Sequence, residues 1–445
     1  MDHLAAASDR PCLSRELLRR VPLVIALPLL SWLGCNAEVG DGKTGAGGGT
    51  GTGGAAAGTG GAAAGTGGAA AGTGGRSGTG GATTTPDGGT TTPDAGTTPW
   101  TAGNPNGSCS GGVPAQGQPA DVSVPTTVVG TGTAASCTFS ELQAAATKGG
   151  VITFNCGGGA VTIPVTATLN LPINKNTVID GGRKITLDGG GAVQIMSFNS
   201  ANFQANDNGL TLQHIALVNG KKTPAVAIPP APAPCSQGWN DGQGGALYMR
   251  DGNLTVIDSI FTNNQAAPLG PDTGGGAIYV LGSKNGVWIV GSTFTGNSAS
   301  NAGAVGGLFA ELNIYNSLFT GNKALGHDAN NNEPSKCSFI NNDQNETGSG
   351  GNGGAIYSDG NSVNVTLCGD AVLGNSAGVK AFGGGLFFTS NDFGGILTIR
   401  DTTMTGNTGG SWTSVSTGSV TNVGTAVGTN TKSITLSSST LQGVP

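Results

Sequence analysis

Apolar and polar residues alternate in short runs after residue 244, and the pattern of runs recurs about every 30 residues. Runs of four to eight residues with period-two alternation predict β-strands, and glycine or Asp-Gly pairs predict the turns between them. A recurring set of several short strands predicts one solenoid coil per repeat, because a lone coil cannot bury its apolar side. The fold class predicted for residues 135–445 is therefore all-β, a single-stranded right-handed parallel β-helix.

Two blocks make up each repeat. The first block is aligned here as Gly244–Tyr248, Gly275–Tyr279, Val305–Phe309, Gly353–Tyr357 and Gly383–Phe387. The second block is Leu254–Asn264, matched by Val287–Asn297, Leu312–Asn322 and Leu397–Asn407. In stacked coils Phe261, Phe294 and Phe319 should superpose as a core column. The asparagines that follow should form a ladder of amides, from Asn264 through Asn297, Asn322 and Asn375 to Asn407.

The residues before the clear repeats indicate the first coils and their cap. Short strand-like runs begin at Val151–Phe154 and continue to Leu210–Leu217. The segment Thr138–Thr147 has apolar residues at helical spacing, with Ser140 available for capping and Gly149-Gly150 at its end. A short N-terminal helix is therefore expected to lie over the open end of the first coil.

Aromatic residues of the first block are the candidate ligand-binding residues. Leu247 and Met249 sit two apart, so period-two alternation predicts that they face inward and that Tyr248 points outward. The same position holds rings in the other coils and would form a row roughly 19 Å long that could stack on sugar rings. These residues are Tyr248, Tyr279, Phe309, Tyr357 and Phe387. A second interpretation is that the alanines and rings face inward and loops cover the aliphatic column.

Two long corner loops offer a further candidate surface. They span residues 220–243 and 323–352 and should leave the same edge of the solenoid, where they would wall a groove. Trp239 in the first loop is a candidate ligand-binding residue. Tolerated insertion is the alternative explanation of both loops.

The N-terminus resembles an export signal. Four arginines precede the apolar run Val21–Leu33, which is too short to span a bilayer but suits a signal peptide. Leu33-Gly34-Cys35 then resembles the lipobox of bacterial lipoproteins. The resemblance implies a removed signal peptide over residues 1–34 and lipid attachment at Cys35, and ordinary cleavage with an incidental cysteine is the alternative.

Residues 35–134 are predicted to be a disordered low-complexity linker. The heptad Gly-Thr-Gly-Gly-Ala-Ala-Ala occurs at 51, 58 and 65, and Thr-Thr-Thr-Pro-Asp occurs at 83 and 90. Such Gly/Ala/Thr/Pro sequence has no residues with which to build a core. The linker would act as a flexible stalk between the membrane and the β-helix.

Charge and cysteine content limit the kinds of molecule that the chain is expected to bind. Without residues 1–34 the chain keeps 15 basic and 22 acidic residues and has no basic stripe, so nucleic acid is not an expected partner. No cysteine or histidine cluster has metal-binding spacing, so no metal or cofactor is expected. Cys137 and Cys156 flank the cap helix and the first strand and are predicted to form a disulfide; Cys235 and Cys337 are a second possible pair.

The repeat resembles a known family. Phe261-Thr-Asn-Asn264, Phe294-Thr-Gly-Asn297 and Phe319-Thr-Gly-Asn322, with the Gly-Gly-Ala-Ile motif, resemble the polymorphic outer-membrane protein repeats. Asn176–Gly182 and Ile185–Gly189 extend a looser similarity to pectate-lyase-like β-helices. These resemblances imply a β-helix exposed at the cell surface, either as an outer-membrane lipoprotein or as a secreted protein.

The sequence therefore favours a surface-displayed binding or structural module, adhesin-like or glycan-binding, attached to the membrane only through a lipid anchor. The alternative is an extracellular polysaccharide lyase or glycoside hydrolase with a divergent site. Such an enzyme needs an acid and a base on one face. Asp241, Asp328 and Glu333 are the carboxylates considered for it, but they form no recognisable catalytic set, and no catalytic residue is assigned.

Overall fold

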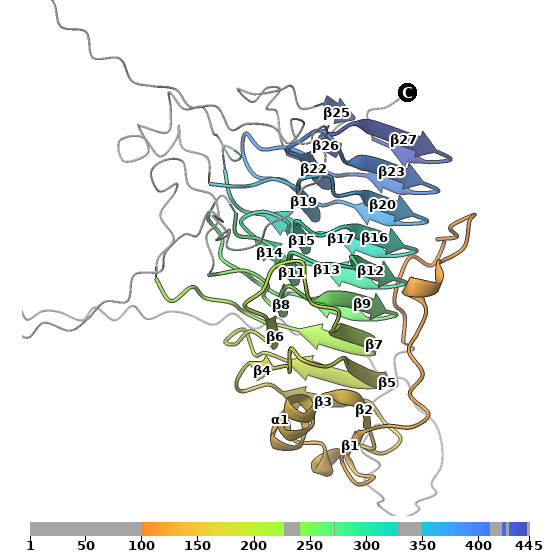
Figure 1. The fold of residues 1–445 in the computed structure, drawn as a ribbon, viewed down its shortest axis with the longest axis vertical. Helices are drawn as coiled ribbons and strands as arrows, with labels where there is room; N and C mark the ends of the chain where they lie inside the picture. The colour runs from red at the N-terminus through yellow and green to blue at the C-terminus, as the bar shows by residue number, and fades with distance from the viewer. Residues whose placement is uncertain are drawn as a thin grey trace, which may run out of the picture. The chain divides into compact units, whose positions relative to one another are not determined.

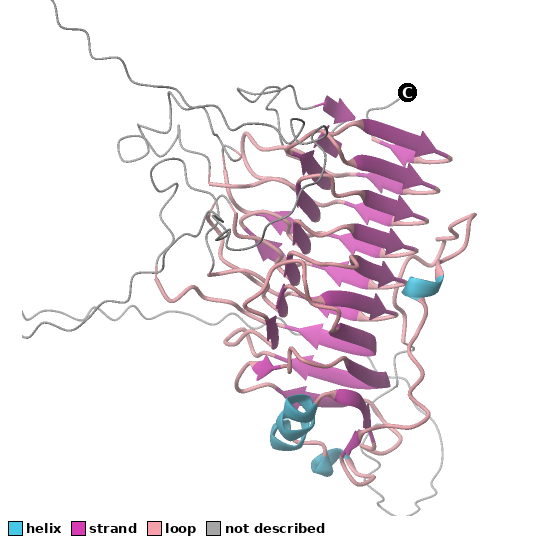
Figure 2. Ribbon diagram, viewed as in Figure 1, coloured by secondary structure: helices cyan, strands magenta, loops and turns pink. Residues whose placement is uncertain are grey.

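The chain folds as a parallel β-helix, which confirms the predicted fold class (Figure 1). The computed structural model describes residues 100–226, 241–270, 272–327, 329, 349–409, 421–423 and 427–442. Strands dominate this part of the chain, and helices are few (Figure 2). No helix among these residues combines the length and the apolar character that crossing a membrane requires.

Each complete coil contributes one strand to each of three faces. Face 1 stacks β4 Leu169–Asn170, β6 Met196–Asn199, β8 Leu247–Arg250, β11 Ile278–Leu281, β15 Val305–Leu308, β19 Ile356–Gly360, β22 Leu386–Ser390 and β26 Val427–Asn430, with β25 Thr421–Val423 antiparallel to β26. Face 2 stacks β1 Thr127–Val129, β2 Gly150–Phe154, the first halves of β5 Thr177–Asp188 and β7 Gly209–Val218, then β9 Asn253–Ile257, β12 Val287–Val290, β16 Leu312–Tyr315, β20 Val365–Cys368, β23 Ile396–Arg400 and β27 Ser433–Ser437.

Face 3 follows face 2 along the chain in every coil. It stacks β3 Val161–Pro164, the second halves of β5 and β7, β10 Ile260–Thr262, β13 Thr293–Thr295, β17 Leu318–Thr320, β21 Ala371–Leu373, β24 Thr403–Thr405 and β28 Thr440–Leu441. The short strands β14 Ser298–Ala299 and β18 Lys323–Ala324 pair just beyond face 3. Neighbouring coils are parallel and in register on all three faces, so equivalent residues form columns along the solenoid.

Aliphatic columns fill the interior. Leu247, Ile278 and Ile356 of face 1 are fully buried and belong to one continuous core with the inward residues of faces 2 and 3. Glycine is favoured at the first position of the repeat, at the entry to face 1. Gly275 has φ of 67°, and a β-carbon there would collide with the carbonyl oxygen of Ile278.

The predicted phenylalanine column is confirmed. Phe261 and Phe294 stack with ring centroids 4.8 Å apart, and Phe294 and Phe319 stack at 4.7 Å. All three side chains are fully buried on face 3. The column continues as aliphatic residues in coils without a phenylalanine, as at Val372.

The asparagine ladder is confirmed as well. Asn297 Oδ1 accepts hydrogen bonds from the backbone N–H and the side-chain amide of Asn264, each at 2.9 Å. Its Nδ2 donates to Asn322 Oδ1 at 2.9 Å and to the carbonyl of Phe261 at 3.1 Å. The same pattern runs through Asn375 to Asn407, and every member is fully buried. The turn after face 3 is therefore held by side-chain amides, coil to coil.

A short helix and a disulfide close the N-terminal end. Helix α1 Phe139–Lys148 buries Leu142 against the first coil, and Gly149 ends it with φ of 65°. Thr138, not the expected Ser140, caps it by accepting the backbone N–H of Glu141. The predicted disulfide between Cys137 and Cys156 is present, with the two Cα atoms 5.6 Å apart.

The predicted domain boundary at residue 135 needs correction. Residues 100–126, here called the strap, are ordered against the outside of face 2 (orange in Figure 1) and include the 3-10 helix η2 Ala115–Gly117. A second 3-10 helix, η3 Ala134–Ser136, and strand β1 precede α1. The strap is glycine-rich like the linker, but external hydrogen bonds and a disulfide hold it. Residues 1–99 of the proposed signal and linker lie outside the described residues.

Asn297→Ala should lower the free energy of unfolding by about 3 kcal/mol, because it leaves buried donors and acceptors of Asn264 and Asn322 without partners. Chemical denaturation measures this loss. Asn361→Ala, at an exposed corner, should lose less than about 0.5 kcal/mol. Equal losses in the two variants would contradict the structural role of the ladder.

Candidate functional site

The aromatic row differs from the predicted one in its register. Tyr279 lies beside Tyr248 on face 1, but its partner on the next coil is Gly306 and not Phe309. In the coil of β15, the first block of the repeat is therefore Ala302–Gly306. This block begins three residues earlier than the one aligned from the sequence, Val305–Phe309. Ala302 there has φ of 51° and takes the place of the usual glycine, which hid the correct register. Phe309 lies past the end of β15, at the corner between faces 1 and 2.

The remaining rings point away from the aliphatic core, as predicted, but they are not an open platform. Tyr279 and Tyr357 are each 2% exposed, and Phe387 is 7% exposed. Phe382 and small residues from neighbouring loops pack over Tyr357 and Phe387 in a second apolar cluster. Gly306 leaves room for the Tyr279 ring, since a β-carbon at Gly306 would lie 2.8 Å from Cδ2. Stacking of a glycan along this row is therefore not supported.

Both buried tyrosines keep their hydroxyl groups hydrogen-bonded. Tyr279 donates to the carbonyl of Asp272 at 3.0 Å, and Tyr357 donates to Asp359 Oδ2 at 2.8 Å. Burial raises the pKa of both phenols well above their ordinary value. Burial likewise raises the pKa of Asp359, although the hydrogen bonds from Tyr357 and Asn391 oppose it. Tyr279 therefore joins the loop at Asp272 to face 1, whereas Tyr357 bonds a residue of its own strand, β19.

Tyr279→Ala and Tyr357→Ala should each cost about 3 kcal/mol of unfolding free energy, because each removes a buried ring and leaves a cavity. Tyr248→Ala, at the half-buried end of the row, should cost less. Denaturation of the three variants side by side measures this order. Losses below about 1 kcal/mol for both buried positions would show that the rings are accessible after all.

The other predicted site residues fall in different places. Trp239, Cys35, Cys235, Cys337, Asp328 and Glu333 lie outside the described residues. Asp241 is described at the end of its loop, where it pairs with Lys222 Nζ at 2.8 Å and accepts the backbone N–H of Ala225. These contacts hold the two ends of the loop together.

The corner between faces 2 and 3 forms the seam along which the strap docks. One residue per coil at this corner has a left-handed backbone, and the set is His214, Asp258, Gly291, Asn316, Gly369, Asp401 and Ser438. Polar side chains of the set accept N–H groups of the strap. Asn316 Oδ1 accepts the N–H of Cys109 at 2.9 Å, and Asp401 Oδ2 accepts the N–H of Ser110 at 2.9 Å. These Ser110 hydrogen bonds lower the pKa of Asp401.

A charged cluster occupies the same seam on three successive coils. His214 Nδ1 lies 3.1 Å from Asp180 Oδ2, and its Nε2 lies 3.8 Å from Asp258 Oδ2. Arg183 Nε contacts the same Asp258 oxygen at 2.5 Å, and the Trp100 indole N–H donates to the other at 3.0 Å. Carboxylates and a histidine at this spacing resemble acid–base machinery. Here they bind each other and the first residue of the strap.

A disulfide fixes the strap at Cys109. Cys109 is joined to Cys368 at the end of β20, across a sequence separation of 259 residues. The Arg400 side chain donates to both sulfurs, at 3.2 Å to Cys368 and 3.4 Å to Cys109. Cys109, Cys368 and Asp401 are the one cluster of metal-ligand type in the part of the chain that the structure describes. Because both cysteines are oxidised to a disulfide, this cluster is not a metal site.

The coil that holds Cys368 contains a buried carboxyl group. A ladder of Ser and Thr hydroxyls links the coils beside the seam, as where Ser317 Oγ accepts the N–H of Ser292. Asp370 replaces the hydroxyl in one coil and accepts the N–H groups of Ser317 at 2.7 Å and Cys368 at 2.9 Å. Complete burial raises the pKa of Asp370 well above its ordinary value, against the effect of those hydrogen bonds.

Asp370→Ser should therefore gain stability relative to the native chain as pH rises. Folding raises this pKa, so the group's contribution favours the fold below about pH 4 and is lost as pH increases through the folded-state pKa. The serine has no such titration. Thermal unfolding of both proteins between pH 4 and 8 measures the difference, and a difference that does not change with pH would contradict a raised Asp370 pKa.

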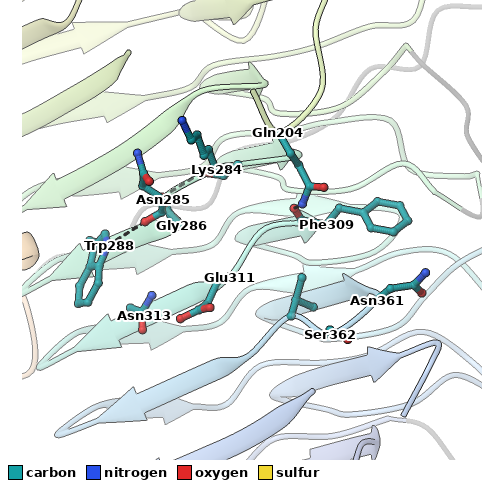
Figure 3. A pocket seen from close by; sticks show the side chains of 12 residues that line it. Gln204, Lys284, Asn285, Gly286, Trp288, Phe309, Glu311, Asn313, Asn361 and Ser362 are labelled. Atoms are coloured by element: carbon teal, nitrogen blue, oxygen red, sulfur yellow. Dashed lines mark hydrogen bonds between the residues drawn. The ribbon is translucent and has the colours of Figure 1, made fainter. Parts of the chain in front are cut away.

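A groove at the corner between faces 1 and 2 is a candidate binding site among the described residues (Figure 3). Its volume is about 350 Å³, and turns of three successive coils line it, at residues 283–286, 309–311 and 361–363. Trp288 and Asn313 form its floor from neighbouring strands β12 and β16, in direct register. Gln204 approaches from the preceding loop and donates to the carbonyl of Phe309 at 2.9 Å.

Asn313 is the unusual residue of this groove. It is 6% exposed, and its side-chain amide has no hydrogen bond to any described residue. Its amide is not one of the buried polar atoms without a partner, so it faces the open groove. An amide in that position can donate to and accept from a polar ligand, which makes Asn313 a candidate binding residue.

Sequence reasoning missed this groove and predicted the buried row instead. The alternation of the second block contained a usable signal for it. Val287 and Leu312 face inward, so the next residues, Trp288 and Asn313, must point outward. Both occupy the position that Thr255 has in the preceding coil. The turns that complete the groove come from separate coils and have no common motif.

Comparison with known proteins gives a family-model match over part of the β-helix. The family model described as the Chlamydia polymorphic membrane protein (Chlamydia_PMP) repeat matches residues 258–281 and 316–359. That family is associated with the outer-membrane surface. No curated protein and no solved structure gives a significant match.

Proposed function

We propose that the protein is an adhesin-like binding module displayed at the cell surface, with its β-helix held away from the membrane by a flexible stalk. The observation that carries this proposal is the strap. A surface adhesin must transmit a pull from its tether to its ligand-binding body without unfolding. The strap gives the N-terminal end of the folded domain such a joint.

The strap distributes load over many coils. From Trp100 it runs past the coil of Asn316 to Ser110, and it then returns so that Ala120 bonds Gln213 and Thr126 bonds Val151. A pull on residue 100 can detach only the segment up to Cys109, because the disulfide to Cys368 stops further peeling. The force then reaches an internal coil of the stack, at β20, with β23 and β27 still beyond it on face 2. In-register strands and two ladders hold this stack together.

The stalk and its anchor belong to the same proposal. The signal peptide at residues 1–34, the acyl chain on Cys35 and the low-complexity stalk would place the β-helix at the outer surface of an outer membrane, with the membrane contacted only through the lipid. The family associated with the matched repeat, and the resemblance of Leu33-Gly34-Cys35 to a lipobox, support this location.

The enzymatic alternative has less support. Asp241, the one proposed catalytic carboxylate among the described residues, closes its own loop. The cluster of Asp180, His214 and Asp258 binds the strap. A polysaccharide-cleaving site would need such groups free to meet a substrate. The groove offers polar binding groups, with Glu311 as the one carboxylate in its lining, and that composition favours binding over cleavage.

Mechanical unfolding tests the strap directly. When the full-length protein is pulled between its N-terminus and its C-terminus, strap detachment should release about 34 Å of chain, ten residues at about 3.4 Å each. The Cys109→Ser/Cys368→Ser variant should release the whole strap, about 90 Å, at lower force. Identical traces from the two proteins would rule out a load-bearing disulfide.

Palmitate labelling in the producing cell tests the anchor. The native chain should incorporate label and remain accessible to protease added outside the cell. Cys35→Ala should lose the label and appear in the medium, since nothing else would attach it to the membrane. Label that persists in Cys35→Ala would disprove the anchor, and a native chain protected from external protease would disprove surface display.

A further inference from the structure

We infer that the groove between faces 1 and 2 binds a neutral, hydroxyl-rich oligosaccharide laid across three coils. This inference names the ligand class of the binding module proposed above and rests on that function. It concerns a different surface from the buried aromatic row, and four features of the groove support it.

The groove has an aromatic floor that is held in place. The Trp288 ring is half-buried and stacks on Tyr315 with centroids 6.1 Å apart and an interplanar angle of 8°. Val113 of the strap packs into the same cluster. The indole N–H lies 3.4 Å from the carbonyl of Asn285. A ring fixed in this way offers apolar surface with little loss of side-chain freedom on binding, and the C–H face of a sugar ring is an apolar surface of matching size.

The polar groups of the groove match hydroxyls. The free amide of Asn313 offers both a donor and an acceptor, as a sugar hydroxyl does. Asn285 and Asn361 add exposed amides at two corners of the groove, one coil on either side of Asn313. Figure 3 shows Asn313 between Trp288 and Glu311, so a hydroxyl bonded to Asn313 would belong to a ligand that also covers the ring.

The charges of the groove favour a neutral ligand. Lys284 is already paired with Asp207, Nζ to Oδ1 at 2.6 Å. Glu311 has no ion pair among the described residues, and its one hydrogen bond is from Asn364 at 3.5 Å. The remaining lone pairs of Glu311 can accept hydroxyl hydrogens, whereas a uronate carboxylate beside it would be repelled.

The length of the groove suits a chain of sugars. Its lining turns belong to three coils about 4.8 Å apart, so it extends roughly 10 Å along the solenoid axis. Its volume of about 350 Å³ is in the range of small-molecule sites.

A glycan array followed by calorimetry tests the inference. Full-length protein, solubilised in detergent, is applied to neutral hexose and N-acetylhexosamine oligosaccharides and to uronate oligosaccharides of equal length. We expect retention of neutral chains and not of uronates. Trp288→Ala should abolish binding, and Asn313→Ala should weaken it about tenfold. Thr398→Ala, two coils further along the same outward column, is the matched control and should bind as the native protein does.

Two further readouts separate binding from folding. Asn313→Ala should keep the native melting temperature, because its amide supports no other group, in contrast to the ladder residue Asn297. Glu311→Gln should increase affinity for uronate oligosaccharides by removing the repulsion. Failure to retain any neutral oligosaccharide, tighter binding of uronates by the native protein, or unchanged affinity in both Trp288→Ala and Asn313→Ala would overturn the inference. These assays use purified protein, so their failure is distinguishable from failure of surface display.

Discussion

In-register stacking of parallel coils is the constraint on which the rest of the structure depends. Each coil is too small to bury its apolar side alone, so the aliphatic columns, the phenylalanine stack and the amide ladder exist only between coils. The asparagine ladder stabilises the stack and also specifies the register in which the coils pair. A coil shifted by one residue would place the Asn297 amide away from Asn264 and Asn322 and would leave buried polar groups without partners. Turns can therefore vary while the stack is preserved.

Register also explains how outward residues become functional surfaces. A residue that faces outward on one coil is beside its equivalents on the next, so small changes along a column create a local surface. Thr255, Trp288 and Asn313 form one outward column on face 2, and this column places an indole ring and a free amide on neighbouring coils. The column at the corner of faces 2 and 3 presents acceptors to the strap, and Trp288 lies between the two surfaces because the strap packs behind it.

The sequence was sufficient for the fold because the fold is periodic. Phe261 and its equivalents, the ladder asparagines, the cap helix and the Cys137–Cys156 bridge were all predictable from spacing. The strap was missed because its glycine and proline content shows only that it cannot build a core of its own. What holds the strap in place is a set of partners elsewhere in the chain. The third block was misaligned because Ala302 adopts a backbone that usually needs glycine. The aromatic row was predicted to point away from the core, correctly, but period-two alternation contains no information about the loops that cover it.

The most direct test of the account is a crystal structure of the protein soaked with a neutral oligosaccharide that it retains. We expect a sugar ring over the Trp288 indole, with a hydroxyl hydrogen-bonded to the Asn313 amide and the chain continuing along the solenoid axis. An oligosaccharide bound elsewhere on the β-helix, with the groove occupied only by water, would contradict it.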